Sequence, residues 1–103
     1  MPDRFKEITR LLEREPNDPF LRYGLAMEHK KAGRLDEALA WFAKTLESDK
    51  TYCYAYYQRG QVLEEQGDTD AAKAEYDRGI TVAKQCNDAH AAGEMQVALD
   101  LLD

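Results

Sequence analysis

Apolar residues along the chain recur at intervals of three and four, and no stretch shows the strict alternation that is typical of a half-buried strand. The spacing predicts six helices, at about 2–15, 19–32, 35–48, 53–66, 69–84 and 88–102. The connections expected near 32–35 and 66–69 are very short, and short connections make consecutive helices antiparallel neighbours. The pattern therefore predicts an all-α protein built from helical hairpins.

The residues between the predicted helices have the chemistry of helix ends. Asp18 can cap the helix that follows it, and either Asp68 or Thr69 can cap the helix near residue 69. Gly33 and Gly67 each follow an amphipathic stretch, where a residue free to adopt a positive φ ends a helix. These residues support the expected helix bounds.

The chain also contains an internal repeat with a period of 34 residues. The stretch KKAGRLDEALAWF at 30–42 returns in the same order of residue types as EEQGDTDAAKAEY at 64–76. The corresponding pairs are Gly33 and Gly67, Asp36 and Asp70, Ala38 and Ala72, Phe42 and Tyr76, and Leu46 and Ile80. A recurrence at this period indicates a repeat architecture. Small residues at Ala26 and Gly60, facing Ala38 and Ala72, are expected to let the two backbones of each hairpin approach closely.

The stretch AYYQRGQVLEEQGDTDAAKAEYDRGI at 55–80 resembles the tetratricopeptide repeat (TPR) at most signature positions. These are Tyr56, Tyr57, Gly60, Leu63, Gly67, Ala72, Tyr76 and Ile80. Residues 19–52 match more loosely, with Arg22 at a place where the family has an aromatic residue and His29 where it has a bulky ring. The resemblance implies a TPR-type α–α superhelix, a right-handed solenoid of antiparallel hairpins. We expect His29 to be a packed, hydrogen-bonded core histidine.

The repeat register divides residues 1–103, taken as one TPR domain, into four segments. Residues 1–18 form an N-terminal half repeat, 19–52 and 53–86 are two full repeats, and 87–103 form a C-terminal capping helix. The last segment departs most from the family pattern. Because terminal repeats need a cover for their apolar edge, covering the final hairpin is favoured over partner binding as its role.

In TPR proteins the first helix of each hairpin lines a concave groove that binds extended peptides or partner helices. Carried over by register, the resemblance implies a binding site at Phe20, Tyr23, Met27 and Lys30 in the first full repeat and at Tyr54, Tyr57, Gln61 and Glu64 in the second. The three-four spacing places each set on one helical face independently of the resemblance. We expect Tyr23 and Tyr57 to face the groove and to lie outside the hairpin seams.

The predicted function is therefore a protein–protein interaction module that binds a peptide or a partner helix in the concave aromatic groove. Two alternatives stay open. The aromatic residues can instead pack against the neighbouring hairpin, because stacking in a solenoid consumes apolar surface on both sides. The chain can also be an oligomerisation module that self-associates through the array ends or through the aromatic face.

Composition narrows the class of partner. The 103 residues are 33% charged and 44% hydrophobic, with a formal net charge of −6. This charge repels nucleic acid and anionic membranes, and the chain has no basic stripe to overcome the repulsion. No apolar run is long enough to span a bilayer, and the first residues contain no apolar segment typical of a secretory signal. We expect a cytoplasmic monomer or weak homodimer.

The candidate chemistry is sparse. Cys53 and Cys86 are expected to lie near each other, reduced and packed. Together with His90 they would be one ligand short of a closed tetrahedral zinc site, which makes that alternative weak. The sequence contains no Gly-rich phosphate loop and no pairing of a nucleophile with a base. We therefore expect a protein that is not an enzyme and that needs no cofactor, metal or disulfide.

Overall fold

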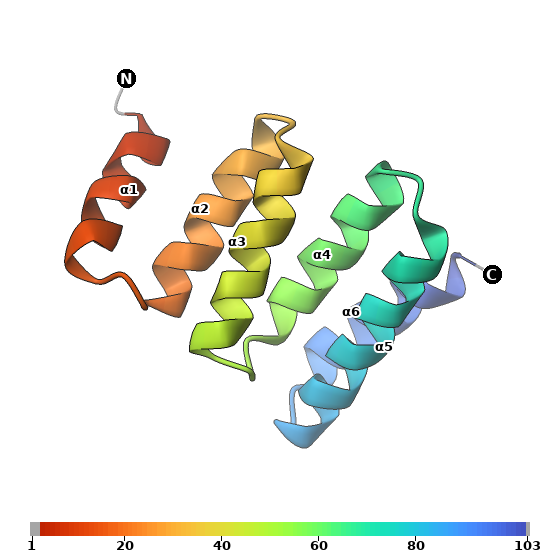
Figure 1. Cartoon of the computed structure of the whole chain (residues 1–103). Coiled ribbons are helices and arrows are strands. Elements are labelled where there is room, and N and C mark those ends of the chain that lie inside the picture. The colour runs from red at the N-terminus through yellow and green to blue at the C-terminus, as the bar shows by residue number, and fades with distance from the viewer. Residues whose placement is uncertain (1–2, 103) are drawn as a thin grey trace. The chain divides into compact units, whose positions relative to one another are not determined.

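The computed structural model describes residues 3–102, and within that range it contains six α-helices and no strand (Figure 1). The helices are α1 (Arg4–Arg14), α2 (Pro19–Lys31), α3 (Leu35–Ser48), α4 (Cys53–Glu65), α5 (Thr69–Gln85) and α6 (Ala89–Asp100). The expected start of the first helix near residue 2 lies outside the described residues. The other ends agree with the sequence prediction to within two residues, which confirms the all-α class.

The helix ends follow the predicted capping chemistry. The carboxylate of Asp18 accepts a hydrogen bond from the Leu21 amide at 3.0 Å, and Asp68 rather than Thr69 caps α5. Gly33 and Gly67 have φ values of 78° and 81°, as expected for the residue after a helix. The role of Asn87 was not predicted: it adopts a φ of 58° after the end of α5, a conformation that asparagine tolerates better than most residues.

The described residues form two compact units, one that contains α1 to α3 and ends at residue 50 and one that begins at residue 51 and contains α4 to α6. In the first unit α2 packs against both α1 and α3. Ile8, Leu12 and Leu25 form a buried cluster between α1 and α2. Ala26 and Ala38 are fully buried, which agrees with the expected close approach of α2 and α3.

In the second unit α5 packs against both α4 and α6. Its largest fully buried side chain is Tyr76, which lies against Gly60 on α4. A Cβ atom at residue 60 would come within 2.3 Å of the Tyr76 ring. The predicted small residue is therefore required here because an aromatic ring occupies the space where a side chain would project.

Candidate protein-binding surface

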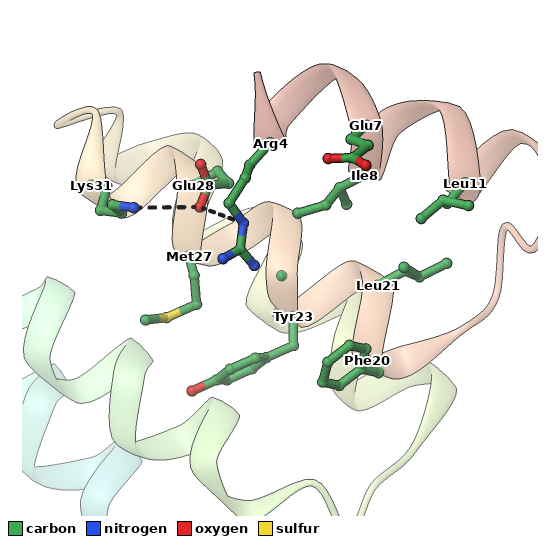
Figure 2. Close-up of a pocket in the computed structure, with 11 residues that line it drawn as sticks. Arg4, Glu7, Ile8, Leu11, Phe20, Leu21, Tyr23, Met27, Glu28 and Lys31 are labelled. Carbon is green, nitrogen blue, oxygen red and sulfur yellow. Dashed lines mark ion pairs between the residues drawn. The ribbon is translucent and has the colours of Figure 1, made fainter. Parts of the chain in front are cut away.

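The first predicted set of site residues lies beside an open groove between α1 and α2, with a volume of about 680 Å³ (Figure 2). Phe20, Tyr23 and Met27 project from α2 along one wall. Phe20 is 72% exposed, which is unusual for so large an apolar side chain. Lys30, the fourth predicted residue of this set, does not line the groove, and its neighbour Lys31 does. We call the surface formed by Phe20, Tyr23 and Met27 the α2 face.

Tyr23 also has a packing role. Its ring meets the buried Phe42 ring of α3 edge-on, with centroids 5.5 Å apart and planes at 60°. The expectation that Tyr23 lies outside the hairpin seam is therefore wrong. The spacing of apolar residues identified the correct helical face, but an aromatic ring is wide enough to reach the seam from that face.

Charged side chains border the same groove. The Glu28 carboxylate forms ion pairs with Arg4 at 3.9 Å and with Lys31 at 3.8 Å (Figure 2). The side chains of the two cations are 70% and 72% exposed. Glu28 itself is only 17% exposed, but both cations lie in water, which screens their charge, so each pair contributes little to stability. Both cations can therefore exchange Glu28 for another acidic group at low free-energy cost.

The second predicted set lies on α4, in the other unit. The rings of Tyr54 and Tyr57 stack at 6.3 Å with an interplanar angle of 22°. Tyr57 also meets the buried Tyr76 ring edge-on at 6.1 Å, so it too reaches its hairpin seam. Tyr54, Tyr57 and Gln61 are all half-buried. These three residues form the surface that we call the α4 face.

Glu64, the last predicted residue of the second set, is engaged within its own hairpin. Its carboxylate accepts a hydrogen bond from the Tyr76 hydroxyl. Burial, and then this bond to a carboxylate, raise the pKa of Tyr76 well above its ordinary value, so the phenol stays protonated and donates. Glu64 therefore stabilises the seam between α4 and α5, a role that the sequence reading did not assign to it.

The structure contains an ionic cluster around a buried carboxylate, which sequence reasoning missed. Glu75 on α5 is 6% exposed and accepts hydrogen bonds from Arg59 at 3.1 Å and from Arg78 at 2.6 Å. A carboxylate this buried needs such partners to offset its desolvation. The repeat gave no signal for the cluster, because Trp41 holds the equivalent place one period earlier.

His29 is a core residue, as predicted. Its ring packs edge-on against Phe5 at 5.1 Å, and its Nδ1 accepts a hydrogen bond from Arg34 Nε at 2.9 Å. Burial and the neighbouring guanidinium lower the pKa of His29, and Glu37 opposes them with a smaller effect. The imidazole is therefore neutral, with its proton on Nε2.

The cysteines differ from each other in exposure. Cys53 is buried and its thiol donates to the Asp88 carboxylate at 3.6 Å, whereas Cys86 is exposed, so the expectation that both pack was wrong for Cys86. Burial and the adjacent Asp88 raise the pKa of the Cys53 thiol. His90 pairs with Glu94 at 2.6 Å. Among residues 3–102 no three metal-ligating side chains cluster, and none of the helices described is apolar and long enough to cross a membrane.

Comparison with known proteins agrees with this architecture. Residues 19–44 and 41–74 each match a family model described as tetratricopeptide repeat. A TPR repeat-containing protein of Pseudomonas aeruginosa is 26% identical over 96 residues, which cover 93% of this chain and 91% of that protein. The chain is also similar to a tetratricopeptide repeat domain protein from Salinibacter ruber, whose solution structure superimposes with a TM-score of 0.80.

That Salinibacter ruber protein is 38% identical, over 85% of this chain and 89% of the other. The solution structure of a Bordetella parapertussis protein gives a TM-score of 0.87 at 26% identity, over 99% of this chain and 89% of that one. The chain therefore belongs to the tetratricopeptide repeat family, and its fold is the all-α TPR superhelix. Domains of this family generally mediate protein–protein interaction and are typically non-catalytic scaffolds.

Proposed function

We propose that this chain is a protein-binding module in which the α2 face and the α4 face each recognise part of an extended peptide or of a partner helix. The observation that supports the proposal most strongly is Phe20. It exposes 72% of its surface at the rim of a groove that Tyr23 and Met27 also line. Exposed aromatic residues in a concave surface are typical of binding hot spots.

The chemistry of the two faces favours a peptide ligand. A tyrosine ring supplies a large apolar contact at low entropic cost, and its hydroxyl can hydrogen-bond to a peptide backbone. Met27 can adapt its flexible side chain to different apolar residues of a ligand. At the border of the α2 face, the exposed cations Arg4 and Lys31 favour a ligand that carries an acidic group beside its apolar residues.

Selection of displayed peptides on the intact chain, followed by titration of a selected peptide, tests the proposal. Phe20→Ala should weaken binding by about 1–3 kcal/mol, the range of an interface hot spot, and should leave the thermal melt nearly unchanged. Leu101→Ala is a matched control, because Leu101 is 80% exposed and lies on neither face. Equal affinities for the two variants and the parent would overturn the assignment of the α2 face.

A further inference from the structure

The open groove between α1 and α2 in the first unit has a counterpart in the second unit, where a helix covers it. Two repeat periods separate α1 and α2 from α5 and α6, so Ile8 corresponds to Tyr76, Leu11 to Gly79, Tyr23 to Ala91 and Met27 to Met95. In the second unit α4 packs on α5 and contacts α6. The α1–α2 groove is therefore the counterpart of the surface on which α4 lies.

Burial differs sharply between the two surfaces. Tyr76, Ala91 and Met95 are fully buried in the second unit, together with Gly79. Among their counterparts in the first unit Ile8 is buried, but Leu11 is 45% exposed, and Tyr23 and Met27 are partly exposed. The α1–α2 groove thus has the same register and a similar apolar lining as the α5–α6 surface. In the second unit that surface is covered by a helix, α4.

The helix α6 has the matching register, because it lies one repeat period after α4. In α4 the side facing α5 includes Arg59, which bonds to Glu75, and Gly60, which lies against Tyr76. The counterparts on α6 are Gly93 and Glu94, and Leu63 corresponds to Val97. None of these three residues of α6 is buried: Val97 is 60% exposed, Glu94 is half-buried, and nothing lies within 4 Å of the place where a Cβ of Gly93 would project.

We propose that α6 of one copy docks in the α1–α2 groove of a second copy and completes a helical hairpin between the two molecules. Charge complementarity supports this occupant. Arg4 holds the register position of Ala72, and Glu94 holds that of Gly60, so the small residues of the α4–α5 seam are replaced by a cation on one surface and an anion on the other. Val97 takes the register position of Leu63, which packs against the buried cluster around α5, and Leu11 lies opposite His90, because its counterpart Gly79 lies against Tyr56.

The proposed contact joins two different surfaces, so it is heterologous: the copy that supplies α6 keeps a free groove, and the copy that supplies the groove keeps a free α6. Association of this kind continues to open chains or closed rings rather than stopping at a dimer. The inference goes beyond the proposed peptide binding and is measured with no peptide present. A failure of peptide binding therefore does not affect it, and the reverse also holds.

Sedimentation velocity across a wide concentration range provides the test. The parent chain should show an average mass that rises with concentration past the dimer. Leu11→Asp should block the groove and Val97→Asp should block α6, so each variant alone should stay monomeric. An equimolar mixture should form a one-to-one heterodimer and nothing larger, because the first variant supplies an intact α6 and the second an intact groove.

Charge reversal gives a second test at two positions outside the buried core, the exposed Arg4 and the half-buried Glu94. Arg4→Glu and Glu94→Arg should each weaken self-association roughly tenfold or more, and the double variant should recover it. Thr9→Asp, which adds a negative charge to an exposed position of α1 away from the groove, should behave as the parent. A parent that stays monomeric at every concentration, a monomeric mixture of the two blocked variants, or a double variant without recovery would each overturn the proposal.

Discussion

The ring of Tyr57 lies edge-on against the buried ring of Tyr76, with centroids 6.1 Å apart and planes at 85°. One repeat period earlier, Tyr23 meets Phe42 at 5.5 Å and 60°. Because the contact recurs in register, an aromatic pair joins the first and second helix of each hairpin. Each tyrosine therefore packs its own hairpin with one ring edge and contributes the rest of its surface to the α2 or the α4 face.

This double role predicts a graded response at Tyr57. Tyr57→Phe should leave the free energy of unfolding nearly unchanged, because the ring and its contact with Tyr76 remain. Tyr57→Ala should lower that free energy by about 1–3 kcal/mol through the loss of a half-buried aromatic contact. Urea denaturation followed by circular dichroism measures both. An alanine variant as stable as the parent would show that the ring does not support the hairpin.

Replacing each of two helical glycines with alanine should change the stability of the fold in opposite directions. Gly60→Ala should destabilise the fold by about 1–3 kcal/mol, since its Cβ would collide with the ring of Tyr76, which is fully buried and cannot move aside. Gly93→Ala should stabilise it by about 0.5–1 kcal/mol, because it meets open space and gains helix propensity. Thermal unfolding of both variants at low concentration provides the comparison. Destabilisation of similar size in both would contradict the packing described for Gly60.

Stability should depend on pH through His29. Its folded-state pKa lies below the ordinary value of about 6.5, so the neutral ring is favoured in the folded chain. The contribution of His29 to stability is complete above about pH 6.5 and is lost as the pH falls through the folded-state pKa, because the unfolded chain takes up the proton first.

The measurement is the melting temperature of the parent and of His29→Tyr between pH 8 and pH 5. The tyrosine keeps a ring at this position and does not titrate in that range. The parent should lose more stability than the variant on acidification, after the shared contribution of the carboxylates is subtracted. Parallel curves would mean that His29 titrates alike in the folded and unfolded chains.

The sequence predicts that α6 covers the final hairpin, and Met95 is the residue through which this prediction can be tested. Met95 is fully buried, and a Cβ at Gly79 of α5 would come within 2.3 Å of its sulfur. Met95→Ala should lower the free energy of unfolding by about 2–5 kcal/mol, whereas Val97→Ala, on the exposed side of the same helix, should change it little. Guanidinium denaturation separates the two, and an equal response at both positions would refute the covering role.

Much of the fold was predictable because the repeat carries its information locally. Asp18, Gly33 and Gly67 mark helix ends by chemistry that acts within one turn, and the period of 34 residues pairs the helices into hairpins. The positive φ at Asn87 was missed, because asparagine is found at many other kinds of position as well as at helix ends.

The candidate site was less predictable, because side-chain partners depend on the packing of two helices. Helical spacing identified the face that carries Tyr23 and Tyr57, but it could not show that their rings reach Phe42 and Tyr76. The hydrogen bond to Glu64 depends on where the Tyr76 hydroxyl emerges from the core, which no residue spacing specifies.

The central claim, that the α2 and α4 faces bind a protein ligand, is tested most directly by aromatic proton NMR during titration with a selected peptide. This measurement needs no substitution and therefore separates binding from folding. We predict that the ring signals of Phe20 and Tyr23 on the α2 face, and those of Tyr54 and Tyr57 on the α4 face, shift and saturate as peptide is added. Shifts confined to α1 or to α6, with these four rings unchanged at saturation, would contradict the claim.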